Sequence, residues 1–394
     1  MTINIVDSRM GEVEILTSDP SLLAKLPTSN VEIKTAKFER RISMKIDEEV
    51  RESRFLCQES DRLEQIPRFD ESDFSTGELL GEGGFCKVYE LKAAIKSCGN
   101  VCVLKSNYQN SVYGQLCAKE VPRYAIKMLN GFDRDEDSQR SKAMIEMGIE
   151  ARFLAVCNHP NILSLRGMSS GDVHGRGSFI ILEQLVESLP ERMNKWKEEE
   201  NQLKISNYEK MRCSPKKQRR RWAHSIGERC NVMIDVVSAM AYLHSQNILH
   251  QDLKPDNLGF DSKGHLKLFD FGFSHEFHEK DKLDDDEYVV HGYGTQRYMA
   301  PEIALRKRCN LSADVFSFAI LFWEAIALEV PFRGFTAITH FELVYNRCFR
   351  PDIPLFWPDN VRKLLERSWS KSITERPNMV EMKELLLQII GECN

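Results

Sequence analysis

Long apolar segments are missing from this chain of 394 residues. The longest apolar run, around Phe316 to Leu328, is too short to span a bilayer and contains Glu324. Residues Met1 to Pro20 lack the apolar core of a signal peptide. We therefore expect no membrane span, and we predict that the apolar run forms a buried helix of the core.

Paired cysteines are also missing, because the 11 cysteines contain no Cys-x-x-Cys spacing. This excludes the regular framework of a disulfide-rich secreted domain. We expect reduced thiols, and so a protein of the cytosol or the nucleus.

Neither sign of charge dominates the chain, since the formal net charge is only −5. The overall balance therefore predicts no nucleic-acid partner and no anionic membrane surface. The hydrophobic content of 42% is enough for a sizeable core. A globular enzyme fits this composition.

The texture of the sequence changes along the chain. Residues 1–68 are rich in Ser, Thr, Glu, Lys and Arg with scattered apolar positions, which predicts a disordered tail. Strand-like segments begin around Leu79, and helical periodicity follows Glu183. We predict an α+β protein with a small strand-rich lobe followed by a larger helical lobe.

Three segments have patterns that predict their structure. Residues 229–244 place Val232, Val236, Met240 and Leu243 on one face at helical spacing. The short apolar runs 179–182 and 266–269 predict strands, the second of which leads directly to Asp270.

A glycine-rich segment follows Leu80 and reads Gly81-Glu82-Gly83-Gly84-Phe85-Cys86-Lys87-Val88. Glycine allows backbone amides to approach phosphate oxygens closely because no Cβ intervenes. Taken alone, the segment favours a simple hairpin turn over a phosphate-binding loop. Cys86 stands where a third glycine is usual for a phosphate-binding loop.

Lys127 ends the apolar run Tyr124-Ala125-Ile126-Lys127, and an inward-facing charge there needs a partner. Glu150 is the candidate, since it shares a helical face with Leu154.

The motif His250-Gln251-Asp252-Leu253-Lys254-Pro255-Asp256-Asn257 carries most of the predicted chemistry, together with Asp270 downstream. Asp252 can orient a substrate hydroxyl or accept its proton, and Lys254 can neutralise charge on a transferring phosphoryl group. Asn257 and Asp270 are candidate Mg²⁺ ligands. These groups indicate phosphoryl transfer.

In this order the motifs resemble those of the eukaryotic-type protein kinases, from about Phe69 to the C-terminus. The resemblance implies an N-lobe at about 69–184 and a C-lobe at about 185–394. It also implies ATP, Mg²⁺ and protein substrates. The implied nucleotide site consists of Leu80, Gly81, Gly83, Val88, Ala125, Lys127, Glu150, and the backbone of Glu183 and Leu185.

Further roles are implied by the same resemblance. Lys254 and Thr295 mark serine/threonine specificity, with Thr295 in the segment 294–302, which resembles the substrate-binding end of the activation segment. Residues 314–318 and 323–324 are similar to the tyrosine-kinase-like group of serine/threonine kinases. Glu302 is expected to pair with Arg376, and Asp314 to brace the catalytic loop, residues 250–257.

Besides Cys86, two positions depart from the family pattern. Gln251 replaces an arginine that often binds a phosphate on the activation segment, and the acidic residues 284–287 nearby would repel one. We therefore hypothesise activation without activation-segment phosphorylation; the alternative is a merely solvated acidic loop.

Gly259 lies where a large residue beneath adenine is usual. Either Leu258 or Phe260 fills the floor, or nucleotide binding is weak.

Two insertions interrupt the match. The first, at about 91–120, carries three cysteines and no nearby histidine, which favours a surface excursion over a zinc site. The second, at 194–221, ends in a basic run at 215–221. That run predicts a solvated loop, with a nuclear address or an acidic-partner site as alternatives.

The prediction is therefore a serine/threonine protein kinase. A pseudokinase, acting as a non-catalytic interaction module, is the alternative kept open by Cys86 and Gly259. A small-molecule phosphotransferase would not need the segment 294–302. The regulator, the physiological substrate and the oligomeric state are not encoded in these motifs.

Overall fold

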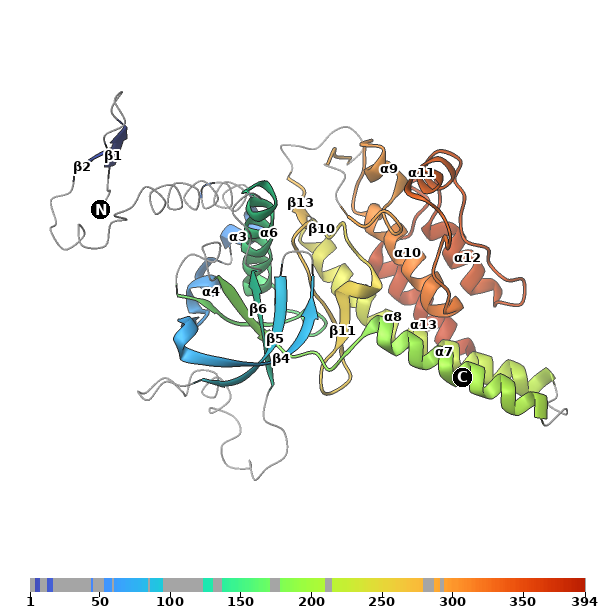
Figure 1. Ribbon diagram of the computed structural model, residues 1–394. Coiled ribbons are helices and arrows are strands. Elements are labelled where there is room, and N and C mark those ends of the chain that lie inside the picture. Colours follow the sequence, from blue (N-terminus) through green and yellow to red (C-terminus); the bar gives the residue numbers. More distant parts are fainter. Residues whose placement is uncertain are drawn as a thin grey trace.

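The computed structural model describes residues 4–7, 13–16, 44, 53–58, 60–83, 86–94, 123–129, 137–170, 178–209, 215–278, 287–290 and 294–393. The described part forms a strand-rich N-lobe and a larger helical C-lobe (Figure 1). This confirms the predicted α+β, two-lobed architecture. Most of the first insertion, with its three cysteines, lies outside the described residues.

The N-lobe is built on a six-stranded sheet in the order β3-β7-β8-β6-β5-β4. Its strands are β3 (Arg68–Phe69), β4 (Phe74–Glu82), β5 (Cys86–Ala94), β6 (Tyr124–Leu129), β7 (Leu165–Ser169) and β8 (Phe179–Glu183). All neighbours are antiparallel except β3 and β7. A short 3-10 helix, η1 (Glu71–Asp73), precedes β4, and the long helix α6 (Asp137–Val156) lies against the lobe (Figure 1).

The predicted disordered tail contains secondary structure that the sequence did not suggest. Strands β1 (Asn4–Asp7) and β2 (Val13–Leu16) pair antiparallel, and two short helices follow, α3 (Arg54–Gln58) and α4 (Ser60–Gln65). Phe55 and Leu56 are buried in the main hydrophobic core, and Leu63 and Ile66 pack against it. The prediction of disorder is therefore wrong for residues 53–58 and 60–66, because their apolar side chains pack against the main hydrophobic core.

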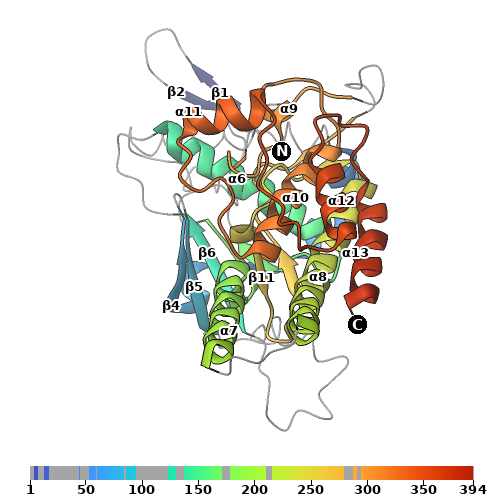
Figure 2. The ribbon, with the colours of Figure 1, turned by 90° about the vertical axis from the view of Figure 1, so that its right-hand side faces the viewer.

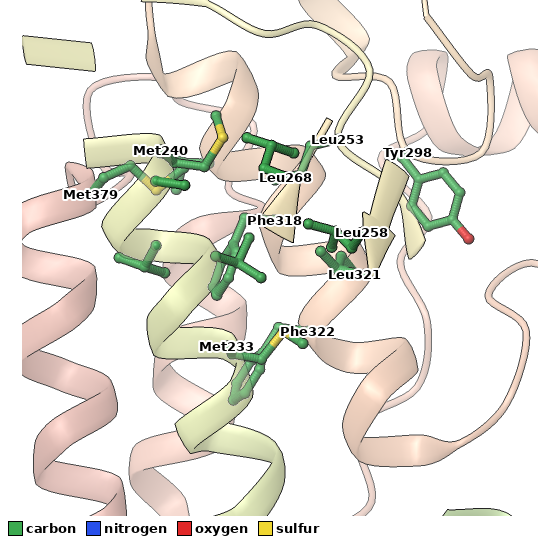
Figure 3. Packing of buried hydrophobic residues seen from close by; sticks show 14 of the residues in the cluster. Met233, Met240, Leu253, Leu258, Leu268, Tyr298, Phe318, Leu321, Phe322 and Met379 are labelled. Atoms are coloured by element: carbon green, nitrogen blue, oxygen red, sulfur yellow. The ribbon is translucent and has the colours of Figure 1, made fainter. Parts of the chain in front are cut away.

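The C-lobe is helical, and its core lies between α8 (Pro215–Ser245), α10 (Ser312–Ala327) and α13 (Met379–Cys393), as Figure 3 shows. The predicted face of α8 is confirmed, since Val236, Met240 and Leu243 are fully buried and Val232 is partly buried against the same core. The remaining helical elements are α7 (Leu189–Glu209), α9 (Pro301–Ala304), α11 (Ala337–His340), α12 (Asp359–Ser368) and the π-helix η5 (Phe341–Asn346).

Helix α10 is the predicted apolar core helix. It is buried along almost its whole length, including Glu324. No helix among the described residues combines the length and apolar composition needed to cross a membrane.

The second insertion is helical, which corrects the predicted solvated loop. Its residues extend α7 and begin α8, so that only 210–214 between the two helices lie outside the described residues. The two helices project together from the C-lobe (Figures 1 and 2). Segment 195–204 is rich in Lys, Glu, Gln and Leu, which are good helix formers, and Pro215 suits a first helical position.

Arg229 on α8 attaches the base of this hairpin to the core. Its side chain is buried, donates to the carbonyl oxygen of Ile326 at 2.9 Å, and pairs with Glu200 of α7 at 2.5 Å. The guanidinium also lies over the Trp196 ring. The hairpin is therefore fixed to the end of α10.

Short strands at the junction of the lobes carry the loops of the site. Strands β9 (Glu187–Ser188), β11 (Leu258–Phe260) and β12 (Leu266–Leu268) form one sheet, and β10 (Ile248–Leu249) pairs with β13 (His275–Glu276). The 3-10 helix η2 (Pro255–Asn257) lies within the catalytic loop. Strands β8 and β12 confirm the two predicted strands.

Candidate active site

The glycine-rich segment is the tip of the β4–β5 hairpin. Gly81 lies opposite Val88, and the N–H of Gly83 donates to the carbonyl of Cys86 at 2.8 Å. A Cβ built on Gly81 would meet no atom within 4 Å. Gly84 and Phe85 lie outside the described residues. In the described part of the hairpin, the space beside Gly81 is open, and the hydrogen bond between Gly83 and Cys86 closes the turn.

Cys86 begins β5 beside the charged centre of the site. Burial raises the pKa of its thiol to about 11, against the opposing effect of Lys127. The side chain therefore stays protonated near neutral pH.

Lys127 and Glu150 form the predicted ion pair between β6 and α6, with 2.5 Å between Nζ and Oε2. Glu150 is almost wholly buried, at 3% exposure. Burial alone would lower the pKa of Lys127, but the carboxylates of Glu150 and Asp270 outweigh it and hold that pKa above its ordinary value. Lys127 is therefore a cation that is fixed between β6 and α6.

The segment after β8 supplies candidate adenine partners. The N–H groups of Gln184 and Val186 donate to backbone carbonyls, whereas the N–H of Leu185 has no partner within the described part of the chain. Ala125 is buried next to Lys127 on β6, and Val88 is paired with Lys127 across the sheet. The Leu185 N–H is therefore a backbone donor without a partner among the described residues, and its contact with adenine stays a prediction.

The floor of the site differs from the prediction. Leu258 and Phe260 are fully buried and flank Gly259 on a strand, so they point to the face opposite to it. A Cβ on Gly259 would lie 2.8 Å from Cδ1 of Leu185 and 3.1 Å from the carbonyl oxygen of Glu187. The Leu185 side chain therefore occupies the space beside Gly259, and neither of the predicted residues fills the floor.

Asp252 is the centre of a dense hydrogen-bond network. Its Oδ1 accepts from the N–H of Thr295 at 2.8 Å and from the hydroxyl of Thr295 at 2.7 Å. Its Oδ2 accepts from Lys254 at 2.6 Å and from the side-chain amide of Asn257 at 3.1 Å. Lys254 also donates to the Thr295 hydroxyl at 3.0 Å. The four residues predicted to carry the chemistry therefore meet at one carboxylate.

The catalytic loop is fixed from below by Asp314 of α10. Its carboxylate accepts from the N–H groups of His250 at 2.9 Å and Gln251 at 3.0 Å, and it contacts His244 at 3.0 Å. Gln251 has a positive φ of 68°, a strained conformation for a residue other than glycine. The two backbone hydrogen bonds to Asp314, from His250 and Gln251, hold this turn, as the resemblance implied.

Gly294 brings the end of the activation segment onto the catalytic loop. It has a φ of 121°, and a Cβ there would lie 2.5 Å from the carbonyl oxygen of Gln251. No other residue fits this contact without moving the backbone. Thr295 is thereby delivered to Asp252.

Asn257 and Asp270 have the donor chemistry for a magnesium ion. The Asn257 amide nitrogen donates to the carbonyl of Asp252 at 2.8 Å, which leaves its side-chain oxygen for a cation. Asp270 has a positive φ of 65° and follows strand β12. Magnesium prefers oxygen ligands and commonly shares them with substrate phosphates, so these residues fit the ion.

The predicted ion pair between Glu302, at the end of segment 294–302, and Arg376 is bidentate. Arg376 donates to both carboxylate oxygens of Glu302, at 2.5 and 3.0 Å, and both side chains are buried. This pair holds α9 to the segment before α13.

Sequence reasoning missed two features of the site. One is the Leu185 side chain described above; the other is Glu324, whose carboxylate accepts from the Tyr298 hydroxyl at 2.7 Å. Burial raises the pKa of Glu324 to about 7. The carboxylate borders a pocket of about 290 Å³ that Asp256 and Arg297 also line. A charged residue inside an apolar helix was the only available signal.

Residues 108–386 match the family model for the protein kinase domain. The chain therefore belongs to the protein kinase family, as predicted. The matched range begins after the glycine-rich segment.

Curated relatives extend this result. The chain is 37% identical over 161 residues to serine/threonine-protein kinase STY17 of Arabidopsis thaliana, covering 41% of this chain and 27% of that protein. It is 36% identical over 159 residues to dual specificity protein kinase shkB of Dictyostelium discoideum, covering 40% and 24%. A probable serine/threonine-protein kinase of Dictyostelium discoideum matches at 26% over 315 residues, 80% of this chain and 19% of that protein. The chain thus spans about a quarter of the length of its first relatives.

Proposed function

We propose that this protein is a kinase that transfers the γ-phosphate of ATP to serine or threonine hydroxyls of protein substrates. The observation that carries the proposal is the network at Asp252, in which Lys254, Asn257 and Thr295 all donate to one carboxylate. A complete Lys127–Glu150 pair accompanies it. Serine/threonine specificity rests on Lys254 and Thr295, the pair that marks it by resemblance.

The residues divide the reaction between them. Asp252 orients the attacking hydroxyl and can accept its proton, while Lys254 offsets negative charge on the phosphoryl group in transit. Lys127, held by Glu150, binds phosphate oxygens, and the Leu185 N–H binds the base. Asn257 and Asp270 would hold Mg²⁺, which supplies charge neutralisation between phosphates when bound.

The test is incubation of the purified chain with labelled ATP, Mg²⁺ and a generic basic protein, followed by phosphoamino-acid analysis. Asp252→Asn is the matched control, because it keeps the size of the side chain. We expect phosphoserine and phosphothreonine from the natural chain only. Equal label with both proteins would refute the catalytic assignment. Nucleotide binding without any transfer would favour a pseudokinase.

Regulation is a second part of the proposal. Gln251 is buried, and its side-chain oxygen has no hydrogen-bond partner in the described part of the chain. Tyr288 stacks on Phe277 at 4.1 Å and exchanges backbone hydrogen bonds with Cys309. These contacts support an activation segment that needs no phosphate on Tyr288. Replacing Ser274, Tyr288 and Tyr293 one at a time tests this, and strict dependence of activity on one of them would contradict it.

For location we propose the cytosol, with the nucleus as an additional site. Cys86, Cys157, Cys309 and Cys348 are free thiols, which suits a reducing compartment. The basic residues 216–221 lie in the first turns of α8. Residues 189–245 fused to a fluorescent reporter would test the address, and a reporter excluded from the nucleus would argue against it.

A further inference from the structure

Residues 53–66, which precede the N-lobe sheet, contact two parts of the active site at once. Helix α3 packs against α6, the helix that carries Glu150. At its start, the Ser53 hydroxyl and the N–H of Phe55 both donate to Oε2 of Glu276, the latter at 3.1 Å. Glu276 is buried in β13, on the segment that follows Asp270. A segment outside the matched family range thus links α6 to the activation segment.

A column of aromatic rings runs from this segment into the catalytic loop. Phe55 stacks on Phe153 of α6, with 6.4 Å between ring centroids, and Phe153 stacks on Phe271 at 5.9 Å. Phe271 in turn meets the His250 ring edge-on at 5.3 Å. Phe271 follows Asp270 directly, and Phe153 lies about one turn from Glu150. Phe55 therefore closes a column whose other rings adjoin the catalytic groups.

Helix α3 depends on these contacts for its existence. A helix this short is unstable in water, because nucleation is not repaid by enough hydrogen bonds. Ser53 caps it by accepting from the N–H of Leu56 at 2.9 Å. Further along, Arg62 of α4 donates to the carbonyl of Val156 at the end of α6, at 3.0 Å. Formation of α3 and the position of α6 are thus coupled.

We propose that residues 53–66 are a clamp that holds the active arrangement of α6 and the activation segment, with Phe55 and Glu276 as positioning residues. The clamp keeps α6 where Glu150 reaches Lys127, and it keeps β13 in place behind Asp270. Its effect on catalysis rests on the proposed kinase function, whereas its effect on α6 does not.

The experiment compares Phe55→Ala with Phe55→Leu in the full chain. Arg54→Ala is the matched control, since Arg54 is exposed on the same helix. Hydrogen exchange is measured for peptides from α6, β13 and α10. We expect Phe55→Ala to raise exchange in α6 and β13 at least 10-fold without changing α10, Phe55→Leu to restore most protection, and Arg54→Ala to match the natural chain.

Kinetics give the second readout. If the chain transfers phosphate, Phe55→Ala is expected to lower kcat at least 10-fold while KM for the protein substrate changes less than threefold. Unchanged exchange in α6, or an equal increase in α10, would overturn the clamp. If the natural chain shows no kinase activity, the proposed function is refuted. The hydrogen-exchange measurement then still decides whether residues 53–66 hold α6 in place. Should Phe55→Ala fail to fold, Ser53→Ala applies the same test at the cap and the Glu276 contact.

Discussion

The contact between Gly259 and Leu185 predicts an energetic coupling that can be measured. A Cβ at position 259 would approach Leu185 Cδ1 at 2.8 Å and the Glu187 carbonyl oxygen at 3.1 Å. At 2.8 Å the Leu185 atom, the end of a flexible side chain, must shift, and at 3.1 Å the backbone oxygen of Glu187 must give by a few tenths of an ångström. Overpacking of this kind costs about 1–3 kcal/mol, so Gly259→Ala is expected to lower the free energy of unfolding by that amount.

The Leu185→Ala variant removes the side chain that the new methyl group meets. Alone it creates a gap in a half-buried position and costs about 1–2 kcal/mol, less than at a fully buried site. In the double variant the added methyl group fills part of that gap. We therefore expect a favourable coupling of about 1 kcal/mol, well above the 0.3–0.5 kcal/mol scatter of independent sites.

Urea unfolding of the natural chain, the two single variants and the double variant gives the coupling free energy from a double-mutant cycle. Calorimetric titration with ATP and Mg²⁺ shows whether the nucleotide binds in the same space. Leu185→Ala is expected to weaken ATP binding, because an apolar surface next to the base is lost. Additive free energies of unfolding would refute the claim that Leu185 fills the space beside Gly259.

Three further predictions concern buried charges. Glu302→Ala leaves Arg376 buried without its carboxylate and is expected to cost about 3–5 kcal/mol in urea unfolding; a cost below 1 kcal/mol would contradict the importance of the pair. Burial raises the pKa of Glu324 to about 7, above that of an unfolded glutamate, so the folded state binds more protons between pH 4.5 and 7. Stability should therefore fall as pH rises through this window, and Glu324→Gln should flatten that slope; an unchanged slope would count against it. Lys127→Met is expected to lower phosphate transfer about 100-fold or more, since Glu150 loses its partner and phosphate its cation. Transfer within twofold of the natural chain would remove Lys127 from the mechanism.

The fold could be predicted where one segment carries its own pattern. Helix α10 and the buried face of α8 follow from apolar spacing, and strands β8 and β12 follow from short apolar runs. Helices α3 and α4 could not be predicted, because segments this short are stable only against α6. The hairpin of α7 and α8 was missed because its outer part has no continuous apolar face, and periodicity was the signal used.

The site could be predicted where ordered motifs name its residues. The pairs Lys127–Glu150 and Glu302–Arg376 appeared as expected, since each partner lies in a motif of its own. The role of the Leu185 side chain could not, because it depends on the register in which β9 pairs with β11, with Ser188 opposite Gly259. That register is a tertiary property, and no local spacing encodes it.

Cys86 has a consequence for the chemical selectivity of the proposed nucleotide site. Thiolates attack electrophiles far faster than thiols, and a pKa of about 11 leaves almost no thiolate at neutral pH. Peroxide and small alkylating reagents in solution will therefore react at this position slowly. A ligand held in the cleft experiences a high effective concentration of the same sulfur, which offsets weak nucleophilicity. Covalent labelling at Cys86 is thus governed by how well a reagent binds rather than by how reactive it is.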